Sequence, residues 1–169
     1  VYADATQTVP KGVLYPLCSM NVAFQRELMG PAFMQGLMGV GQPWSRYDDM
    51  WAGWASKTVA DHIGVGCKSG APYIKHDKAS NPFVNLMKEY KGLEWQEEAV
   101  RFFDTVQLSE ASSTEAGAAF KELADRVEQS LGHLNPYFAR LAQAMRLWVD
   151  VWRETQAGRI EFRPSRTSR

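Results

Sequence analysis

The sequence predicts an α/β fold that ends in an α-helical hairpin. In the first part of the chain, short apolar runs alternate with glycine and proline, a pattern typical of strands and loops. Near residue 110 the composition changes, and apolar residues then recur three and four positions apart with almost no proline, as in amphipathic helices. A length of 169 residues suits one domain, or one domain with an appendage.

The first part, residues 1–108, opens with two expected strands and a loop. Residues 13–17 and 20–24 are apolar and partly β-branched, so each predicts a short strand. Glycine and proline then recur through residues 35–45, which predicts a flexible loop.

A helix should follow that loop. It is expected to begin near Ser45, because Asp48 stands three residues later, at the spacing of a capping box. Gly64 should end it. Beyond this helix the pattern predicts, in order, strands at 65–67 and 72–76, a polar loop with one short turn at 77–92, and a helix at 95–106.

Residues 109–158 carry the clearest pattern in the chain, an antiparallel helical hairpin. Asn135 and Pro136 separate its two arms, because asparagine caps a helix and proline suits the first helical position. Gly158 should end the hairpin, and the basic tail 159–169 is expected to be disordered. The apolar stripes of the two arms are Ala116, Phe120, Leu123, Val127, Leu131 and Leu134, then Phe138, Leu141, Met145, Trp148 and Trp152.

Composition limits the classes of function. The formal net charge is zero with 22% charged residues, which gives no support for nucleic acid or an anionic membrane as a partner. No apolar run approaches the roughly 20 residues of a membrane span. Cys18 and Cys67 show no metal or redox spacing, which favours a reducing compartment. A first residue of valine suggests a processed or truncated product.

The sharpest local feature is the run Arg46-Tyr47-Asp48-Asp49, two adjacent carboxylates at the expected start of a helix. The helix dipole favours the charged forms of Asp48 and Asp49 there. Such an acid could act as a general base or orient a sugar hydroxyl. On spacing alone an ordinary helix cap is the favoured interpretation, since aspartate is common in first turns.

A second group of polar residues follows the predicted strand 72–76. His76, at the strand end, could bind a divalent metal or a diphosphate oxygen, or could be an ordinary exposed histidine. Lys78 and Asn81 could hold phosphate, or could form a solvated turn. Trp44, in the glycine-rich loop, is the aromatic residue best placed to stack on a base or sugar.

These runs resemble the reversibly glycosylated polypeptides of plants and green algae, the UDP-arabinopyranose mutases, over about residues 1–155. Together the matching runs are highly specific, although each alone would be weak. The matching runs are Val9-Pro10-Lys11-Gly12, Met20-Asn21-Val22-Ala23-Phe24, Gly36-Leu37-Met38-Gly39, Gly41-Gln42-Pro43, Arg46-Tyr47-Asp48-Asp49-Met50-Trp51-Ala52-Gly53-Trp54, Lys78-Ala79-Ser80-Asn81-Pro82-Phe83-Val84-Asn85-Leu86, Lys88-Glu89-Tyr90-Lys91-Gly92, Trp95-Gln96-Glu97-Glu98 and Pro136-Tyr137-Phe138.

The resemblance implies an activity and a setting. Members interconvert the pyranose and furanose forms of UDP-arabinose for cell-wall precursor supply and glycosylate themselves reversibly from UDP-sugars. The implied fold is similar to the GT-A glycosyltransferases, with a divalent metal, Mn²⁺ or Mg²⁺. Members work in the cytosol and at the cytosolic face of the Golgi, often as homo- or hetero-oligomers.

Residue by residue, the resemblance gives Asp48 and Asp49 a catalytic or sugar-orienting role and His76 the role of a late metal ligand. It places Asn21 in the sugar pocket, and Arg46 belongs to the same run as the acid pair. Trp44, Lys78 and Asn81 complete the expected substrate-binding set.

The chain departs from the family pattern in covering only its carboxy-terminal half. The acidic triplet for the metal and diphosphate, the glycosylated arginine and the nucleotide-binding βα units are absent. We therefore expect the chain to be inactive alone and to need the amino-terminal half or a homologous subunit. The alternative is a non-catalytic assembly subunit that docks on a partner through Trp148 and Trp152.

Overall fold

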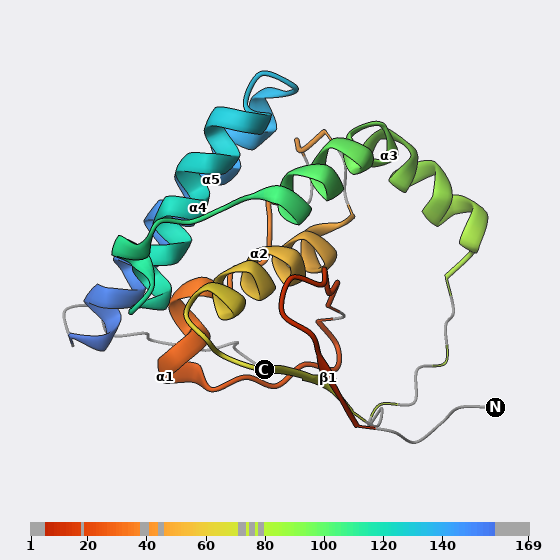
Figure 1. The fold of residues 1–169 in the computed structure, drawn as a ribbon. Coiled ribbons are helices and arrows are strands. Elements are labelled where there is room, and N and C mark those ends of the chain that lie inside the picture. The colour runs from red at the N-terminus through yellow and green to blue at the C-terminus, as the bar shows by residue number, and fades with distance from the viewer. Residues whose placement is uncertain are drawn as a thin grey trace, which may run out of the picture.

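The computed structural model describes residues 6–17, 19–37, 41–43, 46–70, 74, 77 and 80–157. The described chain is mostly helical, with one small sheet (Figure 1). This composition is consistent with the α/β class, and the GT-A-like fold stays a prediction. The elements in order are β1 (Gln7–Val9), α1 (Arg26–Met29), η1 (Gly30–Ala32), α2 (Asp48–His62), β2 (Cys67–Ser69), α3 (Pro82–Thr105), η2 (Glu110–Ser112), α4 (Ala116–Leu131) and α5 (Pro136–Gln156).

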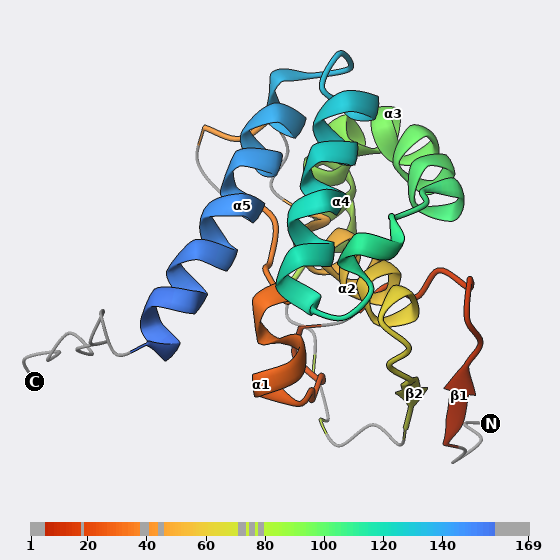
Figure 2. The ribbon, with the colours of Figure 1, turned by 60° about the vertical axis from the view of Figure 1, so that its left-hand side comes forward.

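Helices α4 and α5 form the predicted hairpin and lie side by side (Figure 2). The cap between them is confirmed, because the Asn135 side-chain oxygen accepts a hydrogen bond from the Tyr137 amide at 2.9 Å. Apolar residues at the predicted three- and four-residue spacing are buried along both arms. The boundary at residue 108 and the tail 159–169 stay predictions, and all of that tail lies outside the described residues.

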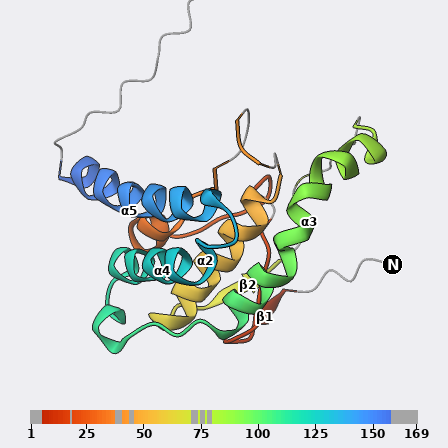
Figure 3. The same cartoon turned by 90° about the horizontal axis from the view of Figure 1, so that it is seen from above.

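Helix α2 crosses the molecule between the hairpin and α3 (Figure 3) and joins them in one core. Its end is as predicted: Gly64 adopts a positive φ of 76°, and the Val65 amide bonds back to the Ala60 carbonyl at 2.7 Å. Its start differs from the predicted capping box. The helix begins at Asp48, and the residue before it is Tyr47, which has a φ of 85° and provides no side-chain cap.

The sheet consists of β1 and β2, which pair antiparallel with Gln7 opposite Ser69 and Val9 opposite Cys67. Strand β1 was not predicted, and β2 lies two residues beyond the strand expected at 65–67. The strand expected at 72–76 lies outside the described residues, apart from Ile74.

The strands predicted at 13–17 and 20–24 are wrong. The described residues of these two runs form no ladder. Gly12, Tyr15, Leu17 and Ser19 instead contact α2. A Cβ on Gly53 of α2 would lie 2.4 Å from the Leu17 amide nitrogen, so the segment packs directly on the helix surface. Contact with a helix therefore replaces pairing with a strand.

Helix α3 is longer than predicted. Its second half corresponds to the helix expected at 95–106, but its first half occupies most of the expected loop at 77–92. Asn81 caps this helix and Pro82 opens it, with the Phe83 amide donating to Asn81 Oδ1 at 2.9 Å. This is the same Asn-Pro signal that marks α5.

Within the described part of the chain, no helix combines the length and apolar character that a membrane crossing requires. The two tryptophans proposed to dock on a partner contact this chain instead. Trp148 Nε1 donates to the Gly30 carbonyl at 3.0 Å, and the Arg26 guanidinium lies 5.1 Å from the centroid of Trp152. The α1–η1 segment thus covers this face of the hairpin.

Candidate functional site

The predicted acid pair lies in the first turn of α2, where both carboxylates are partly exposed. The free backbone amides and dipole of a helix start favour negative charge. Asp49 Oδ2 accepts a hydrogen bond from the Ser19 amide at 3.4 Å, and its Oδ1 accepts one from the Met50 amide at 2.9 Å. The contact with Ser19 brings the loop that carries Asn21 to the acid pair.

Asp48 faces a different part of the chain, the segment around Gly36. A Cβ added to Gly36 would lie 3.2 Å from the Tyr137 hydroxyl oxygen and 3.6 Å from the Asp48 Cα. The backbone at Gly36 therefore passes close to both residues. Tyr137 is only 1% exposed, so its hydroxyl lies inside the core and the contact at Gly36 is one of close packing.

Glu89 of α3 contacts the two residues that precede the acid pair, Arg46 and Tyr47. The Arg46 guanidinium forms an ion pair with the Glu89 carboxylate, and the Tyr47 hydroxyl donates to the Glu89 carbonyl at 3.3 Å. Burial raises the pKa of Tyr47, and the Glu89 charge raises that pKa further while Arg46 lowers it, so the phenol stays protonated and able to donate. The ring fits against Gly92, where a Cβ would lie 2.4 Å from a ring carbon.

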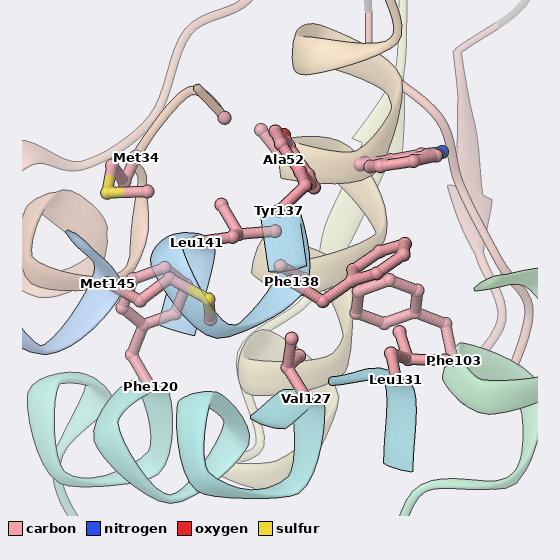
Figure 4. Close-up of a pocket in the computed structure, with 13 residues that line it drawn as sticks. Met34, Ala52, Phe103, Phe120, Val127, Leu131, Tyr137, Phe138, Leu141 and Met145 are labelled. Carbon is pink, nitrogen blue, oxygen red and sulfur yellow. The ribbon is translucent and has the colours of Figure 1, made fainter. Parts of the chain in front are cut away.

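Aromatic side chains pack against the first turns of α2, which carry the acid pair. Trp51 stacks on Phe138 with ring centroids 5.7 Å apart, and its Nε1 donates to Gln96 Oε1 at 3.0 Å. Figure 4 shows the cavity beside these rings, lined by apolar side chains from α2, α3, α4 and α5. Its volume of about 20 Å³ admits little more than one water molecule, so it is a packing gap within the core.

Comparison with known proteins identifies the family. The model of the reversibly glycosylated polypeptides matches residues 1–157, which is nearly the whole chain. The chain belongs to the reversibly glycosylated polypeptide family. It is 57% identical over 153 residues to probable UDP-arabinopyranose mutase 4 of Arabidopsis thaliana, and 54% identical over 153 residues to UDP-arabinopyranose mutase 1 of the same plant. These matches cover 90% of this chain but only 42% and 43% of the two relatives.

This member of the family brings four of its predicted site residues into one region. Asp48 and Asp49 begin α2 and Arg46 lies two residues before it, and the loop of exposed Asn21 reaches Asp49 through Ser19.

Four other predictions are separate from this region or lie outside the described residues. Asn81 lies at the start of α3, eight residues or about 12 Å along the helix from Glu89, where its side chain acts as a cap. Its predicted role in substrate binding stays untested. Trp44, His76 and Lys78 lie outside the described residues.

The sequence analysis missed a polar cavity of about 190 Å³ at the opposite end of α2. Lys57, although buried, bonds the Pro10 carbonyl at 2.9 Å and the Asp61 carboxylate, which also accepts from the Gly12 amide at 2.9 Å. Lysine and aspartate four residues apart on a predicted helix were the available signal. Asp61 is twelve residues from Asp49, about 18 Å along the helix, so the cavity is distinct from the acid pair.

The described residues do not fit a divalent cation by themselves. Over the ranges given above, no point of the structure gathers three histidine, cysteine, aspartate or glutamate side chains. The predicted ligand His76 is not among those residues.

Proposed function

We propose that this chain forms the second half of a UDP-arabinopyranose mutase, the enzyme that interconverts UDP-arabinopyranose and UDP-arabinofuranose. The family match over residues 1–157 is the observation that carries the proposal. The acid pair at the start of α2 supports it, because two partly exposed carboxylates lie beside the loop of Asn21. In this proposal the chain is inactive alone.

The charges around the acid pair suit the sugar better than the diphosphate. Asp48, Asp49 and Glu89 carry three negative charges, and Arg46 offsets one of them through its ion pair with Glu89. This negative surface accepts hydrogen bonds from sugar hydroxyls and repels a diphosphate. The nucleotide and the divalent metal, Mn²⁺ or Mg²⁺, then fall to the GT-A-like remainder of the enzyme, with His76 as one ligand from this half.

The ring change itself needs a site that both accepts and returns protons. Conversion exchanges the bond from C1 to O5 for a bond from C1 to O4, so one hydroxyl loses a proton while the other oxygen gains one. Asp48 and Asp49 are adjacent carboxylates in the part-exposed first turn of α2, and one can accept a proton while the other holds the sugar. Departure of UDP and transient trapping of the sugar on the protein, which accounts for reversible self-glycosylation, would precede this exchange. UDP would then displace the protein from C1 and restore the bond from C1 to the diphosphate oxygen.

The cellular setting follows the same proposal. The enzyme would supply arabinofuranose precursor for cell-wall polysaccharides, in the cytosol and at the cytosolic face of the Golgi, as a homo- or hetero-oligomer. A second candidate function is a non-catalytic assembly subunit, which is favoured by the large apolar side chains that α3 exposes.

A chimera tests the proposed activity. This chain replaces the matched segment of Arabidopsis UDP-arabinopyranose mutase 1, and conversion of UDP-arabinopyranose with Mn²⁺ is followed by chromatography. We expect an active chimera, with Asp48→Asn and Asp49→Asn each reducing kcat at least a hundredfold. Asp150→Asn, an exposed acid on α5, should retain full activity.

A folded, inactive chimera would refute the proposal and favour the assembly subunit. Full activity in both aspartate variants would refute the catalytic role of the acid pair.

A further inference from the structure

Helix α3 exposes a continuous apolar stripe on its outer face. Its four members are spaced i, i+3, i+4 and i+7, so they share one side of the first half of the helix. They are among the most exposed large apolar residues described in this chain: Phe83 at 75%, Leu86 at 53%, Met87 at 70% and Tyr90 at 73%. We call these four residues the α3 stripe.

Contacts on the inner face fix the orientation of the stripe. Asn85, Gly92 and Ala99 follow one another at intervals of seven residues and are buried, so they share the inner side of α3. The Tyr47 ring against Gly92 and the hydrogen bond between Trp51 and Gln96 hold that side in place. Rotation of α3 to bury the stripe would break these contacts, so the stripe needs a cover from outside the described chain.

The position of α3 favours a binding partner as the cover of the α3 stripe. Figure 3 shows its first half extending away from the other helices. Soluble proteins rarely expose contiguous apolar patches of this kind unless they bind another surface. The hairpin tryptophans, by contrast, already contact the α1–η1 segment.

We propose that the α3 stripe is the docking surface for the part of the family polypeptide that this chain does not span. This inference rests on the proposed function, in which that part completes the enzyme. The chain spans only 42% to 46% of its relatives, so more than half of their length lies outside this structure. The contacting face would be apolar, in the way that an amphipathic helix packs in a hydrophobic groove.

Docking on the stripe would also place the partner close to the acid pair. Tyr90 is adjacent in sequence to Glu89, and Glu89 holds both Arg46 and Tyr47. The nucleotide-binding part would therefore reach the residues proposed to hold the sugar. This proximity gives α3 a role in assembling the active site as well as in stability.

Co-purification tests the docking surface. This chain, with an affinity tag, is co-expressed with the separate segment of Arabidopsis UDP-arabinopyranose mutase 4 that lies outside the match. We expect the two to co-purify in equal amounts, and Met87→Glu and Tyr90→Glu each to reduce the recovered segment at least tenfold. Met87→Leu should preserve recovery, because it keeps an apolar side chain of similar size.

Leu147→Glu provides the matched control, because Leu147 is a 60% exposed apolar residue on α5, remote from the stripe. It should change recovery less than twofold. All variants should keep the circular dichroism spectrum of the unchanged chain, since each replaces an exposed side chain.

The docking surface would be overturned by no recovery with the unchanged chain, by recovery that the stripe variants leave intact, or by an equal loss in the Leu147 control. A stable dimer of this chain alone that Met87→Glu dissociates would also overturn it, in favour of a second copy. UDP-arabinopyranose conversion is measured on the same preparations. A complex that depends on the stripe but converts no substrate would refute the proposed function and leave the docking surface intact.

Discussion

Replacing Glu122 by glutamine should make the stability of this protein less dependent on pH. The Glu122 carboxylate of α4 accepts hydrogen bonds from the Ser109 amide at 2.9 Å, the Ser109 hydroxyl at 2.8 Å and the Ser112 hydroxyl at 2.7 Å. Arg126 adds an ion pair at 3.2 Å. Burial raises the pKa of Glu122, but these four interactions outweigh burial and lower that pKa from 4.5 to about 2.

The size and direction of the effect follow from that pKa. Because the carboxyl is more acidic in the folded protein, its stabilisation is fully present above about pH 4.5 and is lost as the pH falls toward 2. The full pKa difference corresponds to an upper limit of about 3 kcal/mol. The Arg126 side chain is 44% exposed, so solvent screening reduces the expected contribution to about 1–2 kcal/mol.

Urea unfolding followed by circular dichroism at pH 7, 5, 3 and 2 measures this contribution. Glu122→Gln should lower the free energy of unfolding by about 1–2 kcal/mol at pH 7 and by much less at pH 2. Glu98→Gln, at a partly exposed glutamate of α3, should stay within about 0.5 kcal/mol of the unchanged protein. An equal loss at pH 7 and pH 2, or no loss at pH 7, would refute the assigned charge effect.

Two further substitutions test how α3 is held. Gly92→Ala places a Cβ 2.4 Å from the Tyr47 ring, so the cost of overpacking should exceed the gain in helix propensity. Thermal melts should show a loss of stability of about 1–2 kcal/mol. The control Gly70→Ala, where the added Cβ meets open space, should be nearly neutral. An unchanged melting temperature for Gly92→Ala would contradict the close packing. Asn81→Ala removes the cap on the Phe83 amide and should lower stability by about 1 kcal/mol, with faster amide exchange in the first turn of α3. Asn81→Asp should keep the cap. Amide exchange that the alanine variant leaves unchanged would contradict the capping role.

The hairpin could be predicted because its sequence and its packing agree. Each arm has one apolar side that the core covers, and the Asn135-Pro136 cap marks the start of α5. The first half of α3 could not be recognised in the same way. Its inner face consists of Asn85, Gly92 and other small or polar residues, while its apolar residues face outward. Periodicity alone therefore gave no reason to extend the helix to Pro82.

The strands predicted within residues 13–24 were wrong for a different reason. Its apolar, β-branched residues fit an extended backbone, but a strand also needs a neighbour, and here the segment contacts α2 through Gly53. The candidate site likewise has a part that the sequence predicts and a part that depends on packing. The acid pair and Arg46 are local in sequence and could be found there, whereas the pairing of Arg46 with Glu89 depends on how α3 packs.

The chain between Gly12 and Ser19 has a minimum length, because its two ends are held at opposite ends of α2. Gly12 is hydrogen-bonded to Asp61 and Ser19 to Asp49, so a connection of seven residues joins two points that lie about 18 Å apart along the helix. Seven extended residues reach at most about 25 Å, and five reach at most about 18 Å. Homologous chains can therefore lengthen this connection, but a deletion of two residues would require it to be fully extended to keep both contacts with α2.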